Sequence, residues 1–169
     1  MRFRFPFLLI LLFLSASSFA ESMDDLVKRG GLYYKKFTDT PFTGRVTVDQ
    51  SRFSPLHYQG SLVNGKREGP WVTYKSDGRL WMKSSYKNGK QEGHWEEYWT
   101  STGQLSQRGH FKDGKQEGLF DFYWEDGRPR AKGRFRNGKF EGSWVFYKED
   151  GSIDKSMTGV YKNDKKISD

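Results

Sequence analysis

The sequence contains a tandem repeat, and the spacing of this repeat limits the fold more than any other feature. A short motif, here called the tag, begins at Asn64, Asn88, Asp113, Asn137 and Asn163, with the sequences "NGKREG", "NGKQEG", "DGKQEG", "NGKFEG" and "NDKKIS". Successive tags start 24, 25, 24 and 26 residues apart. A unit this short cannot bury an apolar surface alone, so we expect the units to stack as an array.

Each unit has the composition of a β-hairpin. The tag is followed by an aromatic segment ("PWVTYK", "HWEEYW", "LFDFYW", "SWVFYK"), by a turn containing Gly ("SDGR", "STGQ", "EDGR", "EDGS"), and by a second segment that ends on an aromatic residue. Asn-Gly and Asp-Gly pairs tolerate the positive φ angles that tight hairpin turns require. The repeats show no sustained 3.6-residue apolar period of a helix. The pattern therefore predicts an all-β fold of successive antiparallel hairpins.

Two aromatic columns run through the first segments. The columns are Trp71, Trp95, Phe120, Trp144 and, three positions later, Tyr74, Tyr98, Tyr123, Tyr147. Because side chains alternate along a strand, the columns should point to opposite faces, each ring packing on its counterpart one hairpin along. The second segments share a glycine column of Gly60, Gly109, Gly133 and Gly159, with Ser84 in the remaining copy. Glycine inside a strand indicates a bulge or a ring lying across the backbone, and we expect the neighbouring Trp to cover it.

The first 20 residues have the layout of a secretory signal peptide. Two Arg precede an apolar run over residues 5–14, and small residues lead to Ala20, after which we expect cleavage. The run is shorter than the roughly 20 residues that cross a bilayer, so we expect no integral membrane protein after cleavage. Loss of Arg2 and Arg4 leaves 27 basic and 21 acidic residues, a net charge of +6. We expect export to the periplasm or the extracellular space, with anionic lipid or envelope polymers, and no nucleic acid, as partners for basic residues.

The remaining 149 residues suit one domain without disulfides, because the chain has no Cys. Residues 21–57 should form an N-terminal cap, in which "PFTGRV" (41–46) is a diverged earlier repeat. Within the cap, "MDDLVKR" (23–29) should form a helical turn, "GLYYKKF" (31–37) a strand and "DQSRFSPLH" (49–57) a loop. Residues 58–169 comprise the tandem repeats and a polar C-terminal end.

These columns resemble the MORN repeat, whose pattern is roughly Tyr-x-Gly-x-aromatic-x-x-Gly-Lys-x-x-Gly. "YQGSLVNGKREG" from Tyr58 matches with Leu62 in the aromatic place. "QRGHFKDGKQEG" and "AKGRFRNGKFEG" lack the leading Tyr, and "MKSSYKNGKQEG" also lacks the first Gly. The Trp-x-x-Tyr strand is more similar to bacterial MORN-variant proteins, some of which are labelled antitoxin components. The resemblance, which covers residues 58 to about 166, implies an elongated single-layer antiparallel sheet that serves as a scaffold, a dimerisation module or a binder of anionic lipid.

The sequence shows no catalytic, cofactor or metal motif. It has no Cys nucleophile and no Ser in a Gly-x-Ser-x-Gly turn, and its three His, at His57, His94 and His110, are scattered. The stretch "GHFKDGKQEG" (109–118) begins like a phosphate-binding loop. However, Gln116 stands where Ser or Thr would hold magnesium, and a strand follows where a helix is required. We therefore expect no cofactor and no enzymatic activity.

Charged residues also form columns in the tags. The glutamates are Glu68, Glu92, Glu117 and Glu141, and the lysines are Lys66, Lys90, Lys115, Lys139 and Lys165. A glycan hydrolase needs two carboxyls in different environments, whereas these form an evenly spaced row. We expect the opposite charges to pair between adjacent turns, each pair contributing about 0–1 kcal/mol.

These observations predict an exported, non-enzymatic repeat protein that acts as a protein-interaction or scaffold module in the cell envelope. The alternative is a binder of anionic lipid or acidic envelope glycan. A glycan hydrolase and an antitoxin component are the less favoured alternatives, and the export signal conflicts with the cytoplasmic partner that an antitoxin implies. The candidate interaction surface consists of Trp99, Trp124, Lys83, Arg108, Lys132, Lys66, Lys90, Lys115 and Lys139.

Overall fold

The structure is a computed structural model that describes residues 20–47 and 56–169. The signal peptide predicted for residues 1–20 lies outside the described residues except for Ala20, and so does most of the loop predicted for residues 49–57. Among the helices of the described part, none is long and apolar enough to cross a membrane.

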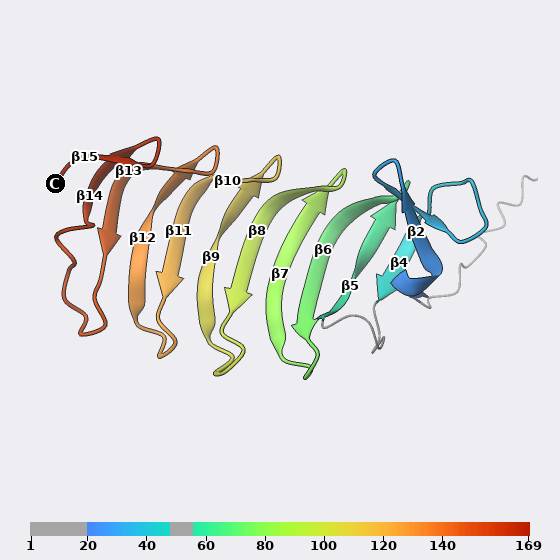
Figure 1. Ribbon diagram of the computed structural model, residues 1–169, viewed down its shortest axis with the longest axis horizontal. Coiled ribbons are helices and arrows are strands. Elements are labelled where there is room, and N and C mark those ends of the chain that lie inside the picture. Colours follow the sequence, from blue (N-terminus) through green and yellow to red (C-terminus); the bar gives the residue numbers. More distant parts are fainter. Residues whose placement is uncertain (1–19, 48–55) are drawn as a thin grey trace, which may run out of the picture.

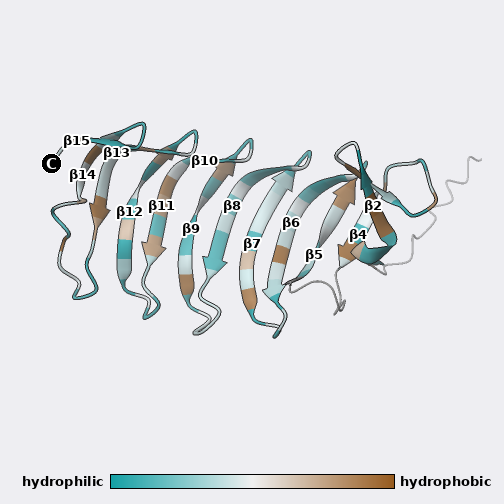
Figure 2. Ribbon diagram, in the orientation of Figure 1, coloured by the Kyte–Doolittle hydropathy of each residue, from teal (hydrophilic) through white to brown (hydrophobic). Residues whose placement is uncertain are grey.

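The described part of the chain forms one long, mostly antiparallel sheet, which confirms the predicted all-β fold (Figure 1). The 13-stranded sheet consists of β1 (Glu21–Ser22), β4 (Gly44–Thr47), β5 (Leu56–Val63), β6 (Lys66–Lys75), β7 (Leu80–Lys87), β8 (Lys90–Tyr98), β9 (Leu105–Lys112), β10 (Lys115–Gln116), β11 (Gly118–Tyr123), β12 (Pro129–Arg136), β13 (Lys139–Phe146), β14 (Gly159–Lys162) and β15 (Lys165–Ser168). Hairpins follow one another along the long axis, and hydrophobic and hydrophilic residues alternate along the strands (Figures 1 and 2).

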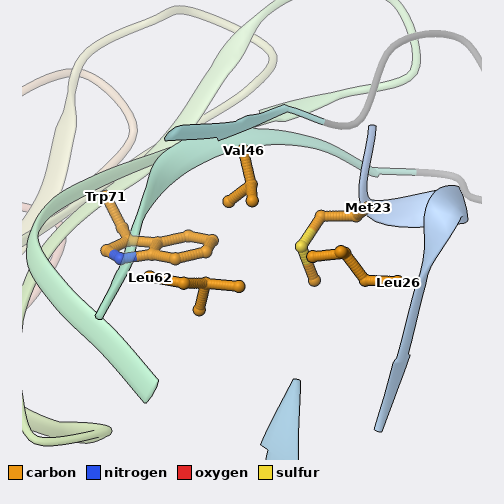
Figure 3. Packing of buried hydrophobic residues seen from close by; sticks show 5 residues of the cluster. All are labelled: Met23, Leu26, Val46, Leu62 and Trp71. Atoms are coloured by element: carbon orange, nitrogen blue, oxygen red, sulfur yellow. The ribbon is translucent and has the colours of Figure 1, made fainter. Parts of the chain in front are cut away.

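The N-terminal segment lies against the first end of this sheet. A short 3-10 helix, η1 (Met23–Asp25), precedes a separate hairpin of β2 (Leu26–Arg29) and β3 (Leu32–Lys35). The predicted helical turn is therefore shorter than expected, because Leu26 already begins a strand. Strand β1 pairs with β4 in parallel, which the hairpin pattern did not predict. Figure 3 shows Met23 and Leu26 facing Val46, Leu62 and Trp71, with which they form one buried cluster.

The five tag turns have the predicted hairpin geometry. The first turn residue, Asn or Asp, has φ between 48° and 53°, and the second has φ between 70° and 84°. Positive φ at both positions defines the type I′ turn, whose twist matches that of the flanking strands. The last tag keeps this geometry although Asp164 has replaced the glycine.

The last glycine of each complete tag forms a bulge. Gly69, Gly93, Gly118 and Gly142 all have positive φ. Between β12 and β13, for example, Lys132 pairs with Val145 and Arg134 with Glu141, so that β13 carries two additional residues. Such insertions bend a strand, which accounts for the curved strands of Figure 1.

Aromatic rings cover three glycines of the column, as predicted, but Gly159 lies against the Ser168 carbonyl and the Lys166 side chain instead. A Cβ atom added at Gly109 would lie 2.5 Å from the ring of Phe120, and one added at Gly60 or Gly133 would overlap the ring of Trp71 or Trp144. In the copy with Ser84, the facing Trp95 is only partly buried. Glycine therefore lets the ring lie directly on the neighbouring strand.

The Trp and Tyr columns lie on opposite faces, as predicted. Trp71, Ser84, Trp95 and Gly109 are paired in one row across β6 to β9, and this side is here called the ring face. On the other face, Lys83 lies 5.3 Å from the ring centroid of Tyr98.

The predicted ladder of rings is only partly correct. Trp95 and Phe120 are neighbours on the ring face, with centroids 6.3 Å apart. Between Phe120 and Trp144 the ring of Phe135 intervenes, 4.8 Å from the first and 5.1 Å from the second. The second-strand rings are large enough to fill the space between consecutive hairpins, so they bridge the column.

The tag glutamates bind backbone, which corrects the expected pairing with the tag lysines. Each carboxylate accepts a hydrogen bond from the first N–H of the next tag, at Asn88, Asp113, Asn137 and Asn163, over 2.8 to 3.3 Å. None of the ion pairs found within residues 56–169 joins a tag lysine to a tag glutamate. The turn N–H is not used in the ladder of its own hairpin, and a carboxylate is a strong acceptor for it.

Residues 41–46 make the contacts of a repeat that precedes the first tag. The Thr43 hydroxyl accepts from the Asn64 N–H at 2.8 Å, as the glutamates do further along. The Gly65 N–H donates to the Phe42 carbonyl, just as the Gly89 N–H donates to that of Arg67. Val46 pairs with Gly60 in the place that Trp144 takes opposite Gly159.

Replacing Glu117 by alanine should lower the free energy of unfolding by about 1 kcal/mol, because the Asn137 N–H loses its acceptor. Glu117→Gln retains an oxygen at the same distance along the side chain and should lose less than half of that. Urea unfolding of both variants measures the difference. Equal losses in the two variants would show that the charge matters and the hydrogen bond does not.

Candidate interaction surfaces

The predicted interaction residues lie in three separate places. Trp99 and Trp124 are next to the turns at Gly103 and Gly127, at the lower edge of the sheet in Figure 1. Lys83, Arg108 and Lys132 lie in one row on the face opposite the ring face. The tag lysines Lys66, Lys90, Lys115 and Lys139 follow the tag turns at the upper edge. Each group is therefore considered by itself.

Acidic residues alternate with the basic row on the opposite face. Across β7 to β12 the paired positions are Lys83, Glu96, Arg108, Asp121 and Lys132. The nitrogen-to-oxygen distances are 3.6 Å for Lys83–Glu96 and 2.9 Å for Arg108–Asp121. The hydrogen bond that Arg108 donates to the Asp121 carboxylate raises the pKa of Arg108. These partners make the row an alternating strip of charge, so it does not form a basic patch.

Trp99 and Trp124 line a shallow cleft of about 310 Å³ beside the turns at Gly103 and Gly127. The Trp99 Nε1–H donates to the Tyr123 carbonyl at 3.2 Å, which fixes this ring. The other lining residues are Glu125, Asp126, Arg128 and Glu149. Because Arg128 pairs with Asp126 at 2.6 Å, the cleft carries an excess of negative charge.

A larger apolar cleft of about 410 Å³ begins on the other side of Trp124. Its lining includes the aromatic residues Phe122, Phe140, Trp144, Phe146 and Tyr147. The Arg130 guanidinium lies 5.7 Å from the ring centroid of Phe122 and 5.6 Å from that of Trp124. The Trp124 Nε1 atom is buried and has no hydrogen-bond partner in the described part of the chain. The cleft thus combines aromatic residues with two cations, Arg130 and Lys148, and two carboxylates, Glu149 and Asp154.

The additional residues of the longest repeat form one wall of the apolar cleft. The final unit is 26 residues long, and its additional residues follow the turn at Gly151. Residues 154–158 leave the sheet, and Asp154 holds them by accepting from the Ser156 N–H at 2.9 Å. Asp154 and Met157 line the cleft, and Met157 is 46% exposed. Neither residue was in the predicted surface, although the irregular spacing was a signal for this segment.

A second row of cations accompanies the tag lysines. The residue directly opposite the lysine across the turn is also basic in four hairpins, giving the pairs Lys87–Lys90, Lys112–Lys115, Arg136–Lys139 and Lys162–Lys165. All eight are exposed. Like charges directly opposite each other destabilise a hairpin, so this arrangement does not serve stability. The sequence analysis named only the lysine of each pair that follows the turn.

Two histidines meet on the face opposite the ring face. His94 and His110 are paired across β8 and β9, with ring centroids 4.0 Å apart. Burial, followed by the neighbouring His94, lowers the pKa of His110. The described residues contain no group of three His, Cys, Asp or Glu side chains that could hold a metal ion.

The comparison with family models matches one repeat. A family described as MORN repeat variant matches residues 67–88, which run from Arg67 of the first tag through the β6–β7 hairpin to the start of the second tag. No curated protein matches the chain. MORN repeats are generally binding modules for proteins or membranes and are typically non-catalytic. The same type I′ turn and glycine bulge recur in the hairpins on either side of the matched segment. Residues 67–88 therefore match a MORN repeat of the variant type, and the hairpins on either side share its turn and bulge geometry.

Proposed function

We propose that the protein is an exported, non-enzymatic interaction module of the cell envelope, and that it holds a partner protein in the apolar cleft of its last repeats. The observation that carries this proposal is a cleft of about 410 Å³ lined by aromatic residues and by the 46% exposed Met157. Removing such apolar surface from water on binding is favourable. The MORN-repeat match of residues 67–88 supports a binding role in general.

The chemistry of the cleft favours an extended peptide segment as its occupant. Rings offer a large apolar area for one or two side chains of the partner. Arg130, which lines the cleft, would attract a nearby carboxylate of the partner. Pockets that bind in this way are mostly apolar with a few convergent polar groups.

The packing beneath the cleft supports a preformed site. Trp144 and Phe120 are each 1% exposed, and Phe140 stacks on Trp144 with ring centroids 3.9 Å apart. Rings held in this way lose little further conformational freedom when a partner binds, which lowers the entropic cost of association.

The first part of the test is made in cells that express the chain naturally. We expect the protein in the envelope or outside the cell, with Glu21 as its first residue. A photoreactive amino acid at Met157, which is exposed beside the cleft, should then give one defined protein adduct. The matched control is the same group at Leu119, which is 67% exposed but outside the cleft.

The second part uses the purified partner from that adduct. Met157→Glu, which places a charge at the apolar wall, should weaken its binding about tenfold or more, a loss of roughly 1.4 kcal/mol. Lys155→Glu, two residues away and outside the lining, should change it less than about twofold. Equal adducts at Met157 and Leu119, or equal binding by both charge variants, would contradict docking in the cleft. A chain that keeps its first 20 residues in the cytoplasm would contradict export.

A further inference from the structure

A separate, strongly basic cleft lies at the other end of the molecule. It has a volume of about 380 Å³ and lies between the β2–β3 hairpin and the first two tag turns. Four cations line it, from Lys28, Lys66, Arg67 and Lys90. Its remaining lining consists of Gly31, Tyr33, Gly65, Tyr86, Asn88 and Gly89. No carboxylate is among these lining residues, so the cleft concentrates positive charge.

The docking of the N-terminal hairpin builds this cleft. The Tyr33 N–H donates to the Gly65 carbonyl at 2.9 Å, and the Gly65 N–H donates to the Phe42 carbonyl at 2.8 Å. A Cβ at Gly65 would lie only 2.8 Å from the Tyr33 carbonyl oxygen, so glycine permits this close approach. These contacts hold Lys28 of β2 near Lys66 of the first tag. The two lysines are 38 positions apart in the chain, so the fold is what brings them together.

Arg67 is fixed within the cleft and has no acidic partner in the described chain. Its Nη1 atom donates to the Tyr86 hydroxyl at 3.1 Å, and its guanidinium lies 4.6 Å from the ring centroid of Trp71. The ion pairs of the described residues include Lys90 with Asp113, at 3.2 Å, but none includes Lys28, Lys66 or Arg67. A half-buried cation without a counterion gains most from an anionic ligand.

We propose that this cleft binds the acidic sugars of a linear polysaccharide and that the polymer continues along the row of paired cations at the tag turns. The cations recognise carboxylate or sulfate groups. The rings of Tyr33 and Tyr86 lie beside these charges and offer flat surfaces to sugar rings. This inference goes beyond the proposed protein partner, whose cleft lies at the opposite end of the sheet.

The period of the basic row favours a repeating polymer. One cation pair follows another after two strands, roughly 10 Å along the sheet, which is comparable with two sugar units of an extended chain. The row runs along one edge in a single line, whereas a membrane presents a plane of headgroups. The basic cleft is also concave, so it can enclose a single sugar residue, whereas contact with a flat membrane surface needs no such enclosure. These features favour a polysaccharide over a lipid surface.

The test is calorimetric titration of the chain from Glu21 to Asp169 with alginate tetrasaccharides, a linear polyuronate, at low salt. We expect saturable binding that weakens as salt increases and that is lost with carboxyl-reduced tetrasaccharides. The double variant Lys28→Gln, Lys66→Gln should bind about tenfold more weakly, as two partly exposed ionic contacts imply.

The matched control is Lys139→Gln, Lys165→Gln, which removes the same charge from the last two tags. A tetrasaccharide in the first cleft is too short to reach the last tags, which begin roughly 30 Å away, so the control should bind within about twofold of the parent. All four lysines are exposed, and the melting temperatures of both variants should match that of the parent. If both double variants bound the tetrasaccharide equally weakly, binding would depend only on the overall charge of the protein, and the cleft would not be the binding site. The protein can instead be titrated with vesicles of equal parts phosphatidylcholine and phosphatidylglycerol. Binding to these vesicles without binding to the tetrasaccharide would show that the ligand is a membrane surface and that the polysaccharide proposal is wrong.

Discussion

Replacing Trp144 by alanine should lower the free energy of unfolding by about 3–5 kcal/mol, the largest loss expected for any single side chain of the array. The ring is 1% exposed and lies between Phe140, at a centroid distance of 3.9 Å, and Phe135, at 5.1 Å. Its Nε1–H also donates to the Arg134 carbonyl at 3.0 Å. The variant therefore leaves both a cavity and an unpaired carbonyl. Urea unfolding followed by circular dichroism measures the loss.

Trp95→Ala is the matched control, because the same residue type occupies the same column but is only partly buried. It should cost distinctly less, in proportion to the smaller area that it removes from water. Equal losses would show that the column contributes through its position in the repeat, and that burial of the individual ring does not decide the cost. In either case the transition should become broader, because repeats that contact only their neighbours unfold less cooperatively once one interface is weakened.

Features determined by neighbouring residues were predictable from the sequence. Asn64 and Gly65 specify a type I′ turn by their own backbone preferences, so the hairpins and their order followed directly. The ring over Gly133 was also predictable. A glycine inside a strand weakens that strand and often marks a close approach of another group, and the next strand contains a Trp that can make this approach. Both inferences needed only the repeat and the chemistry of two residue types.

Features that depend on contacts between distant segments were not predictable in this way. The pairing of tag lysines with tag glutamates was wrong because a free turn N–H, invisible in a list of side chains, competes for the carboxylate of Glu68. The parallel pairing of β1 with β4 has no signal in the hairpin pattern. In residues 41–46, Thr43 stands where the later repeats have the tag glutamate, and Val46 stands where they have the column Trp. The residue types differ, so only the contacts show that this segment corresponds to a repeat.

The same limit applies to the candidate sites. Trp124 was among the residues predicted for the interaction surface, and it lines two clefts. Asp154 and Met157 of the apolar cleft are in a segment whose repeat pattern is lost, so no alignment of the copies selects them. Lys28 precedes the repeats and enters the basic cleft only because the β2–β3 hairpin docks on the first tag turn.

Replacing Gly133 by alanine should lower the free energy of unfolding by about 1–3 kcal/mol, towards the upper end of this range. A Cβ at this position would overlap the ring of Trp144. The ring cannot move aside easily, because it is stacked on Phe140 and meets Phe135 edge to face. Either Trp144 leaves its rotamer or β12 and β13 separate locally. Thermal unfolding, with tryptophan fluorescence as a second signal, should report both the lower stability and a more solvated Trp144.

Ser84→Ala provides the control in the same column. The position already accommodates a Cβ, and its hydroxyl is buried without a hydrogen-bond partner in the described part of the chain. Removing that hydroxyl should leave stability unchanged or raise it by up to about 1 kcal/mol, since an unsatisfied polar group is costly when buried. Two substitutions that end in the same residue should therefore act in opposite directions. If Gly133→Ala proved as harmless as Ser84→Ala, close contact between the ring and the backbone would not be what keeps glycine in this column.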